Sequence, residues 1–297
     1  MLNKKLPVFI TILVAVSIIC GIYIFKFKGN NKDTYKNISV LRISLVPDEG
    51  GDKKYKRYVA ILDRFEESTG ISYKYVPAKS YEDLVEKFIN NEVDFAYFGG
   101  LAFLKAHKEV NAEPLVMRDI DLKFTSYFLA SGNSNLKNIK DFKGKTLSFG
   151  SKLSTSGHLM PRYFMMQEGV IPETFFSKII YSGAHDKTAL LIRDGKADIG
   201  VSNSKVIDNM YSTGELKTKD VKIIKTSPPY PDYVWAVQNY LPQSLKNSLR
   251  DTFTSLLYSD EMDRPLLNNV SSKLFIKADM ADFKPLEDIA YKLKLLE

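Results

Sequence analysis

Three consecutive hydroxyl residues, Ser154, Thr155 and Ser156, stand where the sequence predicts that a strand ends and a helix begins. Residues 145–150 alternate in polarity like a strand, and from Leu159 onward the apolar residues recur at helical spacing. The first turn of a helix has free backbone N–H groups at the positive end of its dipole, and hydroxyl groups add neutral donors. The sequence therefore predicts an anion-binding turn. Ser and Thr are also the commonest N-cap residues, so helix capping alone is the alternative interpretation.

Alternating strands and helices surround this turn. Period-two patterns predict strands at 41–46, 72–76, 93–98, 115–118, 126–130, 146–149, 179–181, 198–201 and 221–225. Apolar residues at helical spacing predict helices at 54–69, 81–90, 100–107, 186–193 and 205–211, and a final amphipathic helix at 286–295. Two α/β units, each with its own sheet, are the simplest organisation of this pattern.

Composition narrows the classes of function. The chain has 297 residues, and its 44% apolar content is enough for real cores. The net charge of +7 comes from scattered lysines without a basic block, so nucleic-acid binding is not indicated. Three histidines and one cysteine predict no metal site, and no Walker A loop or nucleophile elbow predicts a cofactor or catalysis.

The N-terminus carries a nearly unbroken apolar run at residues 6–25, flanked by lysines and long enough to span a bilayer. We expect residues 1–28 to be an uncleaved signal that anchors the chain as one transmembrane helix, followed by a linker at 29–39. Lipidation of Cys20 is the second choice, although a bulky isoleucine precedes it. Cleavage after residues 15–17 is disfavoured, because it would leave an apolar new terminus.

Five segments, taken together and in order, resemble the phosphate/phosphite/phosphonate-binding proteins of bacterial ABC importers over roughly residues 40–260. These are Val93–Gly99, Ser154–Gly157, Ser182–Leu190, Gly195–Gly200 and Pro228–Trp235. The resemblance implies a two-lobed type II periplasmic binding protein of α/β class, each lobe a mixed, mostly parallel sheet flanked by helices. Lobe 1 would comprise residues 40–128 plus 232–297, lobe 2 would comprise 129–231, and the crossings would lie near Phe128 and Tyr230.

The resemblance also implies a ligand set: Tyr81, Tyr97, Ser154, Thr155, Ser156, His185 and Asp232. Neutral hydroxyl donors suit an oxyanion because they cost less desolvation than buried lysine or arginine. An aspartate beside an anion can accept a hydrogen bond from a protonated oxygen and so select the protonation state. The alternatives are that Tyr81 and Tyr97 are ordinary packed aromatics and that Asp232 only starts a turn after Pro231.

Two further residues are secondary candidates. His158 stands in the first helical turn, close to the predicted anion. Lys205 stands where aminoalkylphosphonate binders of the resembled family carry an acid, and a lysine there would repel an amine. It therefore favours phosphate, phosphite or a phosphonate without an amino group, although a solvated first-turn lysine is an equal alternative.

The predicted function is an extracytoplasmic, membrane-anchored and monomeric solute-binding protein. It would capture a phosphorus oxyanion between its lobes and deliver it to the permease of an ABC importer, with no chemistry and no cofactor. One alternative is a membrane-tethered sensor of the same ligand. A less favoured one is a phosphoester-processing enzyme in which His185 and Asp232 act as acid and base.

Overall fold

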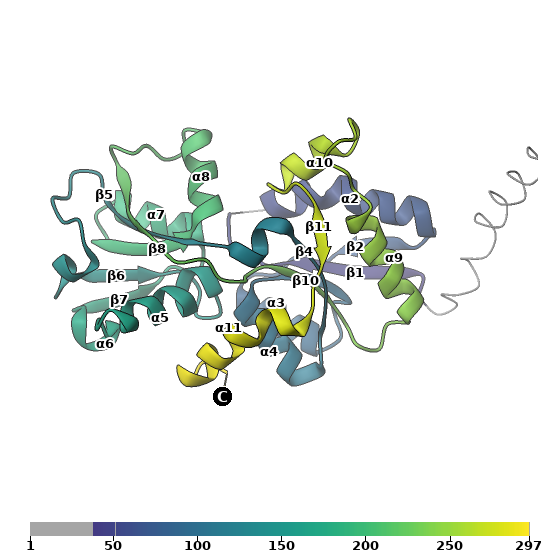
Figure 1. Ribbon diagram of the computed structural model, residues 1–297, viewed down its shortest axis with the longest axis horizontal. Helices are drawn as coiled ribbons and strands as arrows, with labels where there is room; N and C mark the ends of the chain where they lie inside the picture. The colour runs from purple at the N-terminus through teal and green to yellow at the C-terminus, as the bar shows by residue number, and fades with distance from the viewer. Residues whose placement is uncertain (1–37, 51, 297) are drawn as a thin grey trace, which may run out of the picture.

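The computed structural model describes residues 38–50 and 52–296 (Figure 1). The predicted anchor at 1–28 and most of the predicted linker at 29–39 lie outside these residues. Among the helices of the described ranges, none has the length and hydropathy needed to cross a bilayer. The chain folds into two lobes, each built on its own sheet.

Lobe 1 contains a six-stranded sheet in the order β11-β4-β10-β3-β1-β2. Its strands are β1 (Val40–Leu45), β2 (Ser72–Tyr75), β3 (Phe95–Phe98), β4 (Glu113–Arg118), β10 (Val234–Val237) and β11 (Phe275–Lys277). Its helices are α2 (Lys53–Thr69), α3 (Tyr81–Ile89), α4 (Gly100–Val110), η1 (Asp119–Lys123), α9 (Gln243–Thr254), α10 (Arg264–Asn269) and α11 (Met280–Lys292). Strand β1 pairs in parallel with β2 and β3, whereas β10 runs antiparallel between β3 and β4.

Lobe 2 contains a five-stranded sheet in the order β7-β6-β8-β5-β9. Its strands are β5 (Ser126–Ser131), β6 (Thr146–Phe149), β7 (Lys178–Tyr181), β8 (Ile199–Asn203) and β9 (Val221–Thr226). Its helices are η2 (Ile139–Phe142), η3 (Thr155–Leu159), α5 (Met160–Gln167), α6 (Pro172–Phe175), α7 (His185–Arg193) and α8 (Ser204–Ser212). Only β5 opposes its neighbours in direction within this sheet. Each sheet is therefore mixed, but the expected predominance of parallel pairing is not found among the described residues, since three of the five pairs in lobe 1 and two of the four in lobe 2 are antiparallel.

Helix α2 illustrates why the sequence pattern predicts these elements well. Its apolar residues Tyr58, Ile61 and Phe65 recur at helical spacing and are buried against the sheet of lobe 1. The helix ends at Gly70, which adopts the left-handed conformation with φ of 69° that favours glycine. The other predicted elements recur with shifts of at most three residues at their ends, except the final helix, which begins at Met280, six residues before the predicted start.

Two extended segments connect the lobes, and they lie side by side. Phe124 and Tyr230 exchange backbone hydrogen bonds of 2.8 and 3.0 Å at this crossing. The predicted boundary at 128/129 assigned the start of β5 to lobe 1, but all of β5, from Ser126, pairs within the sheet of lobe 2. The first crossing therefore lies four residues before Phe128. An extended chain keeps its alternating pattern as it passes between sheets, so the pattern alone does not mark where it crosses.

Candidate anion-binding site

Four helices begin at the junction between the lobes, each after a strand of a parallel pair. Tyr81 is the first residue of α3, Gly100 of α4, Thr155 of η3 and His185 of α7. The N-terminus of a helix carries free N–H groups and partial positive charge. Ligands of open α/β sheets bind beyond the carboxyl ends of the strands for this reason. The fold therefore brings four anion-favouring helix termini to one place.

The three side chains of the hydroxyl turn, Ser154–Ser156, differ in their hydrogen bonding. The turn is a wide π-helical one, in which the N–H of Leu159 donates to the carbonyl of Ser154 at 3.0 Å. Ser154 caps it, since its Oγ accepts from the N–H of Gly157 at 2.9 Å. The hydroxyl of Thr155 instead accepts from the N–H of Leu101 in lobe 1, also at 2.9 Å. Capping alone thus accounts for Ser154 but not for Thr155.

Ser156 is the third hydroxyl of this turn. Its Oγ is buried and has no hydrogen-bond partner among residues 38–50 and 52–296. A buried hydroxyl without a partner is unusual, because it loses its bonds to water and gains none in return. Its donor is therefore free for a ligand.

Asp232 lies against the start of α4. Its Oδ1 accepts from the N–H of Gly100 at 3.0 Å, while its buried Oδ2 has no partner in the described part of the chain. Burial raises the pKa of Asp232 to about 7, although the N–H of Gly100 and the neighbouring hydroxyls of Thr155 and Ser156 partly offset this. The carboxyl group can therefore hold or release a proton near neutral pH, and can donate to an oxyanion when protonated.

His185 presents a neutral N–H donor. Its Nδ1 accepts from the backbone N–H of Asn203 at 3.1 Å, which assigns the ring proton to Nε2. That nitrogen lies 3.4 Å from the hydroxyl of Tyr81 and 3.5 Å from that of Tyr233. Burial lowers the pKa of His185 to about 4 in spite of the Asp48 carboxylate nearby, so the ring is uncharged at neutral pH.

A buried ion pair supports this histidine from lobe 1. Asp48 is fully buried, pairs with Lys54 and accepts from the hydroxyl of Tyr233 at 2.6 Å. Burial by itself would raise the pKa of Asp48, but the Lys54 ammonium and the hydrogen bond from the Tyr233 hydroxyl more than compensate and hold it below its usual value. The carbonyl of Asp48 also accepts from the N–H of His185 at 2.9 Å, which is a direct contact between the lobes.

Two glycines lie at this cluster, and the space around Gly157 admits no other residue. A Cβ at Gly157 would lie 2.9 Å from both the His185 ring and the Ser154 hydroxyl, too close for any side chain. A Cβ at Gly99 would lie 3.5 Å from Oδ1 of Asp232 and 3.7 Å from Oγ1 of Thr155. The second position shows that residues from both lobes converge on one point.

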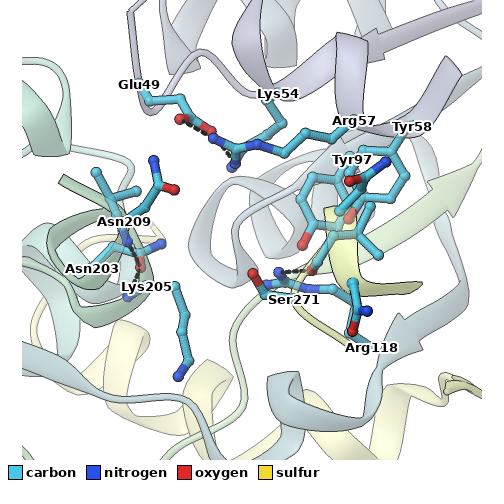
Figure 2. Close-up of a pocket in the computed structure, with 14 residues that line it drawn as sticks. Glu49, Lys54, Arg57, Tyr58, Tyr97, Arg118, Asn203, Lys205, Asn209 and Ser271 are labelled. Carbon is cyan, nitrogen blue, oxygen red and sulfur yellow. Dashed lines mark hydrogen bonds and ion pairs between the residues drawn. The ribbon is translucent and has the colours of Figure 1, made fainter. Parts of the chain in front are cut away.

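Tyr97 lies beside the cluster, at a cavity of about 330 Å³ between the lobes (Figure 2). Its ring stacks on Tyr233 with centroids 5.3 Å apart, and its buried hydroxyl has no partner within the described ranges. Asn203, whose side-chain amide donates to the Tyr233 hydroxyl at 2.8 Å, lines the same cavity from lobe 2. The cavity therefore adjoins the hydroxyl cluster through Tyr97 and Asn203.

The structure brings the seven primary candidates to this junction, whereas the two secondary candidates have other surroundings. The His158 ring packs on Phe149 and Tyr181, its Nδ1 lies 2.7 Å from the carbonyl of Lys152, and its Nε2 accepts from Arg162 at 3.1 Å. Both ring nitrogens have hydrogen-bond partners within the protein, so this histidine stabilises the turn and presents no donor to a ligand. Lys205 is half exposed at the cavity rim, with its ammonium 3.6 Å from Asp208.

Several residues at the junction are not among the seven ligands that the sequence predicts. Asp48 and Asn203 follow or end strands β1 and β8, so their position at carboxyl strand ends is a signal that could have found them. Arg118, the last residue of β4, carried the same signal, whereas Lys54, inside α2, carried none. Lys54 reaches the junction only because α2 packs there.

Comparison with known proteins supports the interpretation of this junction as an anion-binding site. The family model described as "ABC transporter, phosphonate, periplasmic substrate-binding protein" matches residues 43–283. A probable ABC transporter phosphite-binding protein, PhnD1 of Prochlorococcus marinus, is 30% identical over 279 residues, which cover 90% of this chain and 94% of that protein. The phosphate-import protein PhnD of Mycolicibacterium smegmatis is 28% identical over 228 residues, covering 72% of this chain and 70% of its own.

Solved structures agree in fold. PhnD1 of Prochlorococcus marinus in complex with methylphosphonate has a TM-score of 0.80 at 31% identity, covering 86% of this chain and 99% of that one. A binding protein component of an ABC phosphonate transporter from Pseudomonas aeruginosa has a TM-score of 0.78 at 21% identity, covering 87% and 88%. At that identity the second likeness concerns the fold alone.

Proposed function

The chain belongs to the family of periplasmic substrate-binding proteins of phosphonate ABC transporters, and we propose that its buried hydroxyl cluster captures phosphate, phosphite or a small phosphonate. PhnD1 is named for phosphite and was solved with methylphosphonate, and the mycobacterial relative is named for phosphate import. These ligands share a tetrahedral phosphorus with charged oxygens. The proposal assigns them to the cluster formed by Tyr81, Tyr97, Ser154–Ser156, His185 and Asp232.

The observation that carries this proposal is the set of uncommitted polar atoms in the buried junction. Ser156 Oγ, Tyr97 Oη and Asp232 Oδ2 have no partner among the described residues, yet all three are buried. Leaving such groups unpaired costs free energy, and the oxygens of a bound oxyanion would satisfy them. The neutral His185 Nε2–H and the four helix N-termini supply further attraction.

Contacts between the lobes support binding by hinge closure. The N–H of Leu101 reaches Thr155, the N–H of His185 reaches the carbonyl of Asp48, and the N–H of Gly50 donates to Asp186 at 2.9 Å. The lobes are thus in contact around the cluster, and an anion would enter when they separate at the crossing segments. Closure excludes water and places the donors in advance, which strengthens each hydrogen bond.

Delivery to an importer completes the proposed function. The apolar run at residues 6–25 would hold the chain in the membrane with both lobes outside the cytoplasm, beside the permease. We expect a monomer that retains this segment. Mass spectrometry of the membrane-extracted protein, together with light scattering, tests both points. A terminus beginning after residue 17, or a lipid on Cys20, would replace the anchor with a different attachment.

Calorimetry on the full chain in detergent micelles tests the ligand class. We expect phosphate, phosphite or methylphosphonate to bind with a micromolar or tighter dissociation constant, and 2-aminoethylphosphonate to bind more weakly because Lys205 lies at the rim. Sulfate is the matched control for a tetrahedral oxyanion without phosphorus. If none of the three phosphorus compounds binds more tightly than sulfate, the proposed function is wrong. A phosphate-release assay with phosphate esters should show no turnover.

A further inference from the structure

A cavity lies beside the hydroxyl cluster, and phosphate or phosphite bound in the cluster would not need this additional space. The volume of the cavity is about 330 Å³. Lobe 1 contributes Lys54, Tyr58 and Arg118 to its wall, and lobe 2 contributes Asn203 and Lys205 (Figure 2). Phosphate or phosphite in the cluster would leave this space filled with water alone.

The wall of the cavity is cationic and rich in amides. Its charged side chains are Lys54, Arg57, Arg118, Lys205 and Glu49, and asparagines and a serine make up most of the remainder. The one carboxylate among them, Glu49, is held by both terminal nitrogens of Arg57 at 2.7 Å. The carboxylates that pair with Lys54 and Arg118 are Asp48 and Asp121, which are fully buried behind the wall and do not line it.

Two phenol hydroxyls in this wall have no partner. Tyr58 Oη and Tyr97 Oη are both buried, and neither has a hydrogen bond within residues 38–50 and 52–296. Burial raises the pKa of Tyr58 to about 12, against the opposing effect of Arg118, so its hydroxyl stays protonated. Both residues line the cavity, and Tyr58 keeps a proton that an acceptor reaching its hydroxyl would receive. The Arg118 guanidinium lies 5.8 Å from the centre of the Tyr97 ring, on the same wall.

We propose that this cavity is a subsite for an acidic substituent on the ligand, so that the chain favours phosphonates that carry a second anionic group, such as a carboxylate. The inference rests on the proposed function, because the phosphoryl oxygens must occupy the adjoining hydroxyl cluster. Tyr58 then donates to the substituent, because the Tyr97 hydroxyl is assigned to the phosphoryl oxygens, while Lys54, Arg118 and Lys205 supply positive charge. An ammonium group in the same place meets three cations that repel it and that offer it no hydrogen-bond acceptor.

A matched ligand series tests the subsite. Calorimetry on the full chain in detergent would compare 3-phosphonopropionate, propylphosphonate and 3-aminopropylphosphonate, which differ mainly in the charge at the end of the chain. We expect the carboxylate to bind at least about tenfold more tightly than the propyl compound, since a few charge-assisted hydrogen bonds suffice for that factor. The amine should bind most weakly. If the propyl or amino compound binds as tightly as the carboxylate, the inference is wrong.

Three variants locate the effect in the wall. Lys205→Glu should lower the affinity ratio of 3-phosphonopropionate to propylphosphonate about tenfold, and Tyr58→Phe should lower it severalfold without changing the shape of the cavity. Lys196→Glu makes the same change of charge at a residue that precedes β8, whereas Asn203, at the cavity, ends that strand. This variant should leave the ratio unchanged. Equal effects of Lys205→Glu and Lys196→Glu would reduce the effect to overall charge and overturn the subsite.

Methylphosphonate separates this inference from the proposed function. If methylphosphonate binds and the carboxylate has no advantage over the propyl compound, only the subsite fails. If no phosphonate, phosphate or phosphite binds, the proposed function fails and the subsite fails with it.

Discussion

The hydroxyl of Thr155 accepts a hydrogen bond of 2.9 Å from the backbone N–H of Leu101, and this bond joins the two lobes. Thr155 opens the hydroxyl turn of lobe 2, and Leu101 stands in the first turn of α4 in lobe 1. Because the oxygen accepts from Leu101, its own proton remains to be donated. One side chain thus connects closure of the lobes to the donor set of the proposed site.

Replacing Thr155 by valine removes both roles while nearly preserving shape. The N–H of Leu101 loses its partner in a buried place, and the ligand loses one donor, at a combined cost of about 1–3 kcal/mol. We expect anion affinity to fall about 5- to 150-fold in calorimetry, with little change in fold. Thr252→Val, which removes a hydroxyl bonded to a helix carbonyl in α9, is the matched control. An unchanged affinity in Thr155→Val would exclude this residue from the site.

Much of this site could be predicted because its residues are local to single turns. The segment at 154–156 follows a strand and precedes a helix, and the structure has a helical turn beginning there. The sequence could not assign a separate role to each hydroxyl. Those roles depend on Gly157 within the turn and on Leu101, which is 54 residues away in the chain.

Other features depend on which elements meet in space, and no local pattern reports that. His158 stands in the right turn for a ligand, but its ring packs on the sheet side, against Phe149. Lys54 stands in the first turn of an ordinary helix, and its cation reaches the cavity only through the packing of lobe 1. The crossing before β5 is hidden for a similar reason, since an extended chain looks alike in either sheet.

Gly99→Ala tests whether the point of convergence is the ligand site. The added methyl group would make ordinary contacts of 3.5 Å with Asp232 and 3.7 Å with Thr155, so it fits without a clash. The backbone of Gly99, at φ of −77°, accepts alanine. We expect stability to change by less than about 1 kcal/mol, the usual cost of alanine at an N-cap position. Affinity should fall at least tenfold, because the methyl group occupies space between the donors. If the variant is stable and binds with native affinity, the ligand does not bind next to Gly99.

The ion pair between Lys53 and Glu215 also joins the lobes, at 3.1 Å, but we expect it to matter little. Both side chains are about half exposed, at 52% and 47%, and exposed ion pairs contribute roughly 0–1 kcal/mol. Glu215→Gln should therefore change anion affinity by less than about fivefold in calorimetry at physiological salt. A larger loss would assign control of closure to this surface pair rather than to the buried contacts around Thr155.

The raised pKa of Asp232 predicts a pH-dependent difference in stability between the native chain and Asp232→Asn. In the unfolded chain an aspartate ionises near pH 4, whereas Asp232 in the folded protein ionises at about 7. Stability that is present below pH 4 is therefore lost as the pH rises toward 7, and stays lost above it. Asparagine does not ionise, so the free energy of unfolding of the variant, relative to that of the native chain, should rise by a few kcal/mol between pH 4 and 7.

The histidines require this comparison to be a difference between two proteins. Burial lowers the pKa of His158 and of His185 to about 4, so their contribution to stability rises with pH over the same window. That rise is common to both proteins and cancels in the difference. Urea unfolding of the full chain, followed by the fluorescence of its single tryptophan, the fully buried Trp235, measures the two curves. Parallel curves from pH 4.5 to 8 would mean that Asp232 ionises normally and cannot supply a proton to a bound oxyanion.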